Sequence, residues 1–164
     1  MPTQKAIFNI ENKAGKAYIS IIGYIGGWKN NAESFTKKVS ELLEAGVEDV
    51  EAYINSYGGS TFEGIEMGNQ IKRFPGTKSV KVGAIAASMG SGLIPFFDTA
   101  KGHSNTQVMM HDPIMYPSIK SEDDFESNKQ LYVNTKNNLI DLYDSKMNLD
   151  KKKIAKMMNK TTWL

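Results

Sequence analysis

The chain has 164 residues, of which 40% are hydrophobic and 23% charged, which is ordinary for one globular domain with its own core. Twenty Lys and Arg residues against eighteen Asp and Glu leave a net charge of +2, so charge gives no case for nucleic acid or an anionic membrane as a partner. The absence of cysteine excludes disulfides, thiol catalysis and cysteine-ligated zinc, and two histidines are too few for a histidine-only metal site. Carboxylates could still hold a hard cation, but we expect neither a metal nor another cofactor.

No apolar run approaches the roughly 20 residues of a membrane-spanning helix. The N-terminal stretch MPTQKAIFNIENK lacks the basic-then-apolar order of a signal peptide. A cytoplasmic protein that does not enter the membrane is the expectation.

The first part of the chain alternates strand and helix patterns. β-Branched and aromatic residues predict a strand over 18–25, and apolar residues at helical spacing over 35–43 predict a helix with Gly46 at its C-cap. A second strand is expected over about 50–55, ending on the turn 56–59.

The next pattern predicts a helix over about 61–73. Ser60 followed three residues later by Glu63 is a capping box, and Pro75 with Gly76 ends the helix. The inward face is predicted to consist of Phe62, Ile65 and Ile71.

Two further strands follow. Residues 79–86 alternate and then become wholly apolar, as in a strand that enters a core, and 106–110 predict another strand. Between them, a small-residue turn and a helix are expected over 87–97, with Pro95 bending or ending the helix. Strand and helix in alternation predict an α/β fold with a mostly parallel sheet.

A long polar helix is expected over about 121–147, and a short one over 150–158 with Asp150 as N-cap. The long helix is too polar to lie buried on one small domain, so we expect it to project or to pack against a neighbouring subunit. No repeat or linker is apparent, and 1–164 is interpreted as a single domain.

Three small-residue turns follow predicted strands, where sites of α/β proteins gather. In the first, 55–60, paired glycines can aim backbone N–H groups at a carbonyl oxygen or an anion. By spacing alone, a tight turn without function is the more common explanation.

The second turn, 86–92, holds Ser88 among small residues, as expected of an exposed nucleophile at a strand-to-helix turn. Its own N–H and that of the next residue could stabilise an oxyanion. Because position 86 is Ala, this is no G-x-S-x-G elbow, and a plain helix-capping serine explains the pattern equally well.

The third turn follows the strand 106–110 directly and holds His111. Such a histidine is more often structural, but His103 lies in a polar loop and is expected to be solvated. If Ser88 has a base, His111 is therefore the candidate.

Together, the segments Tyr53-Ile54-Asn55-Ser56-x-Gly58-Gly59, Ala86-Ala87-Ser88-Met89-Gly90 and Met109-Met110-His111-x-Pro113 resemble the Clp protease proteolytic subunit family in order and spacing. The resemblance implies a serine endopeptidase that cleaves peptides or proteins with Ser88 as nucleophile and His111 as general base. The implied oxyanion hole consists of the N–H groups of Gly59 and Met89. The implied substrate-binding residues are Gly58, Ser60, Asp112 and Pro113.

The resemblance also implies a spiral of ββα units, as in the ClpP and crotonase folds. The head would comprise about 1–115 and 150–164, with 121–147 as a projecting handle helix. The implied assembly is a homo-oligomeric seven-membered ring or double ring. An AAA+ ATPase partner is compatible with the family, but no feature of this sequence requires one.

The sequence departs from the family pattern in two features that bear on catalytic activity. The family's third triad residue, an acid, corresponds to Thr161, whose hydroxyl can hold an imidazole tautomer but cannot offset the imidazolium charge. Asp112 adjoins His111 and should point elsewhere, whereas Asp141 or Asp144 could supply an acid. The sequence also stops at Leu164, where a further strand and helix are expected.

The N-terminal segment 23–28 resembles the phage and prophage branch, which includes head-maturation proteases. We weigh two alternatives to an active protease of this kind. One is a catalytically impaired ring-forming scaffold or partner subunit. The other is a crotonase-type acyl-CoA enzyme, which leaves the serine and the histidine unexplained.

Overall fold

The computed structural model describes residues 7–27 and 31–164. Part of the N-terminal stretch discussed above, residues 1–6, and Trp28 of the phage-like segment lie outside the described residues. Within the described part of the chain, no helix is long and apolar enough to cross a membrane.

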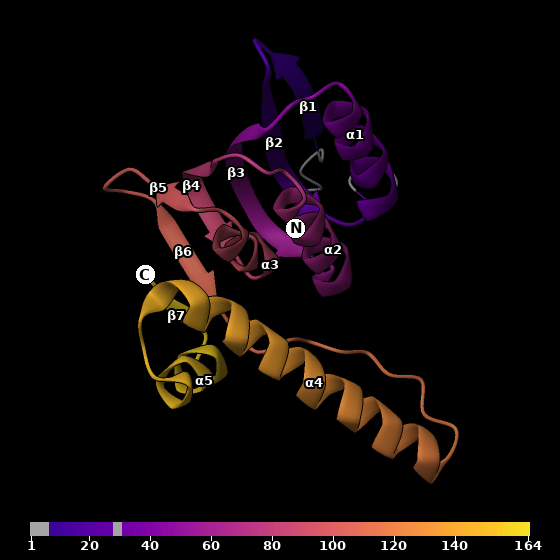
Figure 1. The fold of residues 1–164 in the computed structure, drawn as a ribbon. Coiled ribbons are helices and arrows are strands. Elements are labelled where there is room, and N and C mark those ends of the chain that lie inside the picture. Colours follow the sequence, from indigo (N-terminus) through magenta and orange to yellow (C-terminus); the bar gives the residue numbers. More distant parts are fainter. Residues whose placement is uncertain (1–6, 28–30) are drawn as a thin grey trace. The chain divides into compact units, whose positions relative to one another are not determined.

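A mostly parallel sheet forms the centre of the fold, as the sequence predicts (Figure 1). Its strands are β1 (Ile7–Lys13), β2 (Lys16–Ile25), β3 (Asp49–Gly59), β4 (Lys78–Ala87), β5 (Thr99–Lys101), β6 (Gln107–Met110) and β7 (Thr162–Trp163). The order is β1-β2-β3-β4-β6-β7, with β5 beside β4. β1 runs antiparallel to β2, and the pairs β2–β3, β3–β4, β4–β5 and β4–β6 are parallel.

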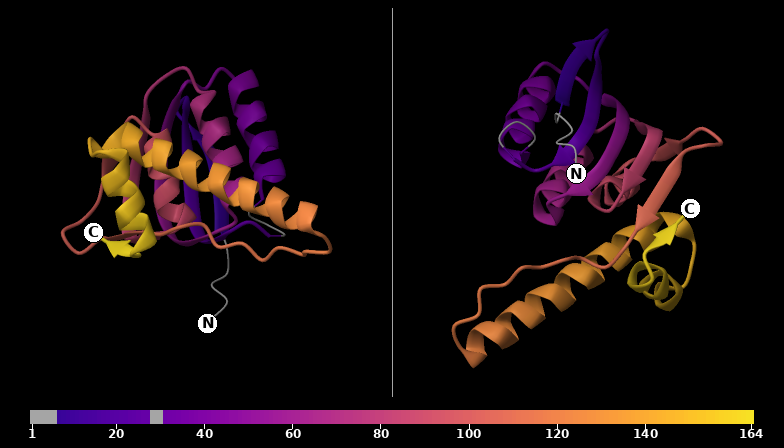
Figure 2. Two further views of the ribbon diagram at one scale, coloured as in Figure 1. Left: turned by 90° about the horizontal axis from the view of Figure 1, so that it is seen from below. Right: turned by 180° about the vertical axis from the view of Figure 1, so that it is seen from behind.

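Helices connect the parallel strands. They are α1 (Ala32–Glu44), α2 (Thr61–Lys72), the single turn α3 (Met89–Gly92) and the 3-10 helix η1 (Ile94–Phe96). α1, α2 and α3 lie on one face of the sheet (Figure 2). Alternate residues of β2 and β3 are buried, including Ile19, Ile21, Ile54 and Ser56, because successive side chains of a strand point to opposite faces.

The chain divides into two compact units, which are described separately. Unit 1 comprises residues up to Met109 together with Trp163–Leu164, and unit 2 comprises Met110–Thr162. Unit 2 contains α4 (Glu122–Met147) and α5 (Lys151–Asn159). α5 thus lies in unit 2 and Trp163–Leu164 in unit 1, while the division into a head and a handle helix stays a prediction.

The expected helix ends in unit 1 are confirmed. Ser60 begins α2 and accepts a hydrogen bond from the Glu63 N–H. Gly46 follows α1 with a φ of 74° and donates its N–H to Leu43, while Val47 donates to Leu42. This pair of bonds satisfies carbonyls at the end of α1 and requires a left-handed residue, which explains the glycine.

The predicted inward face of α2 is wrong at Phe62, whose side chain is 58% exposed. The buried face carries Gly64, Met67, Gly68 and Ile71 instead. A Cβ at Gly64 would lie 2.3 Å from the Met89 side chain. Close packing through two glycines therefore sets the rotation of α2, and apolar periodicity does not register glycines as core residues.

Three other element predictions need correction. The turn 56–59 belongs to β3, because Gly58 and Gly59 still pair with β2. The expected helix over 87–97 is two short pieces, α3 and η1, with Pro95 in the first turn of η1. β1, β5 and β7 were not predicted.

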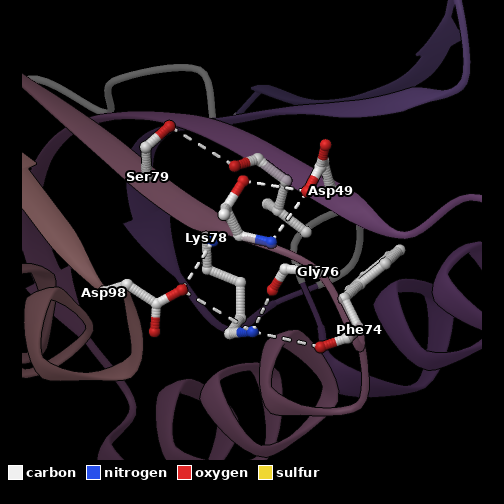
Figure 3. Close-up of polar contacts among 8 residues, drawn as sticks. Asp49, Phe74, Gly76, Lys78, Ser79 and Asp98 are labelled. Atoms are coloured by element: carbon white, nitrogen blue, oxygen red, sulfur yellow. Dashed lines mark hydrogen bonds and ion pairs between the residues drawn. The ribbon is translucent and has the colours of Figure 1, made fainter.

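The connection from α2 to β4 is held by polar groups (Figure 3). Lys78 Nζ donates to the Phe74 carbonyl at 3.1 Å and the Gly76 carbonyl at 2.5 Å, and lies 3.7 Å from Asp98 Oδ2. Asp49 Oδ1 accepts from the N–H and the hydroxyl of Thr77 at 2.7 and 2.8 Å. These bonds fix where β4 enters the sheet and so support the segment that leads to Ser88.

In unit 2, the expected long helix is confirmed as α4, with Ser121 as its N-cap. Its buried residues, Thr135, Leu139, Ile140 and Tyr143, all lie in the C-terminal half, where α4 contacts α5. Phe125, Leu131 and Val133 are exposed. Asp150 begins α5 as predicted and accepts from the Lys152 N–H.

Candidate active site

Ser88 stands at the strand-to-helix turn between β4 and α3, as the sequence predicts. Its backbone has φ 55° and ψ −129°, a combination that costs a residue with a side chain about 1–3 kcal/mol. An L-residue persists there only when its surroundings impose the conformation. The source of that constraint is therefore part of the site.

Hydrogen bonds hold both sides of Ser88. Its N–H donates to the Met109 carbonyl at 2.9 Å, and its carbonyl accepts from the N–H groups of Ser91 and Gly92 at 3.0 and 3.1 Å. Ser91 Oγ lies 2.7 Å from the Ser88 carbonyl and also 2.7 Å from the Met109 carbonyl. Ser91, which is 1% exposed, thus ties the serine turn to β6.

The glycine pair of β3 packs directly against this turn. A Cβ at Gly58 would lie 2.6 Å from Ser88 Cβ and 2.9 Å from the Met89 nitrogen. A Cβ at Gly59 would lie 2.0 Å from the Ile25 carbonyl oxygen. Both glycines have positive φ, 97° and 153°. The structure therefore brings together the first two turns singled out in the sequence, and both positions require glycine.

Two serines support the glycine pair. Ser56 is fully buried; its hydroxyl donates to the Gly23 carbonyl at 2.6 Å and accepts from the Gly58 N–H at 3.0 Å. Ser60, a predicted substrate-binding residue, caps α2, and its N–H donates to the Ile25 carbonyl at 2.8 Å. Met89 is the first residue of α3, where an N–H has no intrahelical partner.

His111 directly follows β6 and is half-buried. The next residue, Asp112, donates its N–H to the Met158 carbonyl at 3.2 Å. One oxygen of the Asp112 carboxylate, Oδ2, lies 2.6 Å from Lys136 Nζ on α4. Pro113 is buried. The carboxylate is thus directed to α4, as expected from its position beside His111, although Asp112 was also assigned to substrate binding.

Thr161, the predicted third triad position, has an exposed side chain and a positive φ of 54°. Its N–H donates to the Met158 carbonyl at 3.1 Å, but its hydroxyl makes no hydrogen bond within residues 7–27 and 31–164. Asp141 and Asp144, weighed as alternative acids, both face Lys151 Nζ, at 2.7 and 3.9 Å. Both carboxylates therefore lie beside a lysine of α5.

His103 lies in the exposed loop before β6, as expected, and is held there by Thr106, whose hydroxyl accepts from the His103 N–H. Within the described ranges, no group of three or more His, Asp or Glu side chains could hold a metal ion.

Sequence reasoning missed Ser91 and Lys136. Ser91 lies three residues after Ser88, the spacing at which a helical serine bonds back to a carbonyl, so a signal was present. Lys136 lies 24 residues after Asp112, and no spacing rule connects them.

The fold defines an α/β protein with a mostly parallel sheet, in which Ser88 stands in a strained turn at the end of one strand and the glycine turn of the neighbouring strand packs against it. Residues 9–164 match the Clp protease family. The match covers most of the chain, and the chain belongs to this family.

Two curated relatives agree with that assignment. The ATP-dependent Clp protease proteolytic subunit 1 of Protochlamydia amoebophila (strain UWE25) is 32% identical over 116 residues, covering 68% of this chain and 55% of the relative. The subunit of the same name from Chlamydia abortus (strain DSM 27085 / S26/3) is 31% identical over 116 residues, covering 68% and 59%. The chain spans a little over half the length of these relatives.

Proposed function

We propose that this chain is a serine endopeptidase that uses Ser88 as nucleophile and His111 as general base. The observation that carries the proposal is the backbone of Ser88, which is strained and is held on both sides by hydrogen bonds. A serine that merely capped α3 would need no positive φ, and the Ser88 side chain makes no capping bond to α3. Strain that the surroundings maintain is typical of catalytic positions.

In the proposed mechanism, His111 removes the Ser88 proton as Oγ attacks the scissile carbonyl, and later gives that proton to the leaving amine. The N–H groups of Gly59 and Met89 donate to the oxyanion that develops. Gly58 contributes by having no side chain, since a Cβ there would meet Ser88 and Met89.

Thr161 remains the predicted third position. Its exposed hydroxyl would have to turn to His111 when substrate binds, and a neutral group there would stabilise the imidazolium less than a carboxylate does. We therefore propose an enzyme with a low turnover rate.

An active-site serine probe tests the proposal. A fluorophosphonate should label the parent chain once, on Ser88, as located by mass spectrometry, and should not label Ser88→Ala. Ser127→Ala, which changes an exposed serine of α4, should label like the parent. An assembled parent protein that carries no adduct on Ser88 would contradict the proposal.

A second candidate is a catalytically impaired subunit that serves as a scaffold or partner. The exposed Thr161 hydroxyl, which has no hydrogen bond within the described ranges, favours this candidate. Thr161→Asp separates the two functions. Restored or increased peptide hydrolysis means that the remaining site is intact, whereas a parent and a T161D variant that are both inactive indicate the scaffold.

For both functions we propose a homo-oligomeric ring acting on or holding peptide or protein substrates. The names of the two relatives describe them as ATP-dependent, so an ATPase partner is a further proposal for this chain.

A phage-type role in head maturation rests on the N-terminal segment alone. Hydrolysis of an unfolded protein without any ATPase would favour that role.

A further inference from the structure

Unit 2 contains an ion pair that is placed directly beside the proposed base. Lys136 Nζ lies 2.6 Å from Asp112 Oδ2, and the Tyr132 hydroxyl, one turn earlier on α4, lies 3.4 Å from the same oxygen. The two side chains of the pair are only 25% and 18% exposed. The other carboxylate oxygen, Oδ1, is buried and has no hydrogen-bond partner among the described residues.

The Lys136–Asp112 ion pair is much less exposed than the Lys151–Asp141 pair of the same unit. The Lys151–Asp141 pair, which joins α5 to α4 within unit 2, lies at 2.7 Å with side chains that are 59% and 60% exposed. An exposed pair of this kind contributes little, because water and salt screen it. A mostly buried carboxylate with an unpartnered oxygen depends much more strongly on its one cation.

The ion pair helps to hold the backbone next to His111 in place. The peptide between His111 and Asp112 is fixed by the bond from the Asp112 N–H to the Met158 carbonyl of α5. The Asp112 side chain is fixed by α4, and the following residue is the buried Pro113, which restricts the backbone of Asp112 further. The chain after His111 is thus attached to both helices of unit 2.

We propose that Lys136, through its ion pair with Asp112, is a positioning residue for His111. The inference rests on the proposed function, since it assigns Lys136 a role in placing the general base. Lys136 acts through Asp112 and the backbone, without touching substrate. Catalysis depends steeply on placement: a displacement of about 1 Å can reduce the rate by about 100-fold.

The test compares Lys136→Met with Lys151→Met, a matched control that removes the exposed Lys–Asp pair. We expect Lys136→Met to lower kcat about 10- to 100-fold with KM changed less than about twofold. Lys136→Arg, which keeps a cation, should recover most of the loss. Lys151→Met should behave like the parent. Unchanged kcat in Lys136→Met, or no recovery with Arg, overturns the proposal.

A double variant tests whether the loss in kcat is due merely to misfolding. Asp112→Asn/Lys136→Met removes both charges, so that no buried charge is left unpaired. We expect this double variant to fold, as judged by its thermal unfolding, and still to show the loss in kcat. Parental kcat in the double variant overturns the proposal.

A measurement that does not depend on catalytic activity distinguishes this proposal from the proposed function. The chain has two histidines, so His103→Gln assigns both imidazole Cε1–H signals in an NMR spectrum. Lys136→Met should shift or broaden the His111 signal and leave that of His103 unchanged, whereas Lys151→Met should affect neither. If the parent hydrolyses no peptide, the proposed function fails while this spectrum still decides the positioning role. An unchanged His111 signal overturns it.

Discussion

Ser88 shows how a single residue can depend on partners that its own sequence neighbourhood does not reveal. The small residues around it permit a tight turn, but they do not force φ to 55°. That conformation is imposed by the Met109 carbonyl, 21 positions further along the chain, and by the buried Ser91. Ser88 could therefore be proposed as the nucleophile from the sequence, whereas its strained backbone could not be predicted.

Ser91→Ala tests this dependence. The substitution removes a hydroxyl that lies 2.7 Å from two carbonyls, so we expect the free energy of unfolding to fall by about 1–3 kcal/mol. Labelling of Ser88 by a fluorophosphonate should slow about tenfold, because a relaxed turn misplaces the proposed nucleophile. Denaturant unfolding and labelling rates measure the two effects, with Ser127→Ala as control. Unchanged labelling would show that the remaining bonds hold Ser88 by themselves.

At the scale of elements, most predicted strands and helices are confirmed within a few residues. Hydrophobic periodicity, helix-capping residues and terminating glycines predict them, because all three are local features of the sequence. α4 and its Ser121 cap are examples. The rotation of α2 was wrong because Gly64 and Gly68 pack against Met89 and Phe96. Close packing of a helix backbone against side chains of another element depends on the tertiary structure, and hydrophobic periodicity does not record it.

The hydrogen bonds between Asp49 and Thr77, at the junction between β3 and β4, predict that the stability of the fold depends on pH. The Thr77 hydroxyl, followed by its N–H, lowers the pKa of the Asp49 carboxyl below its ordinary value of 3.8. A lowered pKa means that the ionised carboxylate stabilises the folded state above 3.8, and that this contribution is lost as the pH falls through the lower folded value.

Asp49→Asn should therefore lower the melting temperature relative to the parent at about pH 7, and the difference should shrink steadily below about pH 4. Thermal unfolding followed by circular dichroism across this range measures it. Glu44→Gln, which changes an exposed carboxylate of α1 outside this junction, serves as the control. A difference that grew on acidification would contradict the assigned role of Asp49.

At the scale of the whole molecule, unit 2 exposes several large apolar side chains. α4 contributes Phe125, Leu131 and Val133, and the segment before it contributes Ile114, Tyr116 and Ile119. Large apolar side chains exposed along neighbouring stretches of the chain are consistent with an interaction surface. We expect it to be covered by other copies of the chain in the proposed ring.

Leu131→Glu should accordingly weaken self-association about tenfold or more while leaving thermal unfolding of the protomer nearly unchanged, because Leu131 is 42% exposed. Asn137→Glu adds the same charge at an exposed polar position of α4 and should assemble like the parent. Sedimentation velocity measures both variants. A parent chain that sediments as a monomer at all concentrations would contradict the expectation.

The sequence by itself determined the α/β class, the mostly parallel sheet, the long polar helix and the family, because each follows from local periodicity or from motifs in a fixed order. It also named Ser88, Gly58, Gly59 and His111. Only the tertiary structure decided that Gly58 packs on Ser88, that Ser91 binds two carbonyls and that Lys136 pairs with Asp112. These contacts join residues across folded elements, and packing alone determines which side chains meet there.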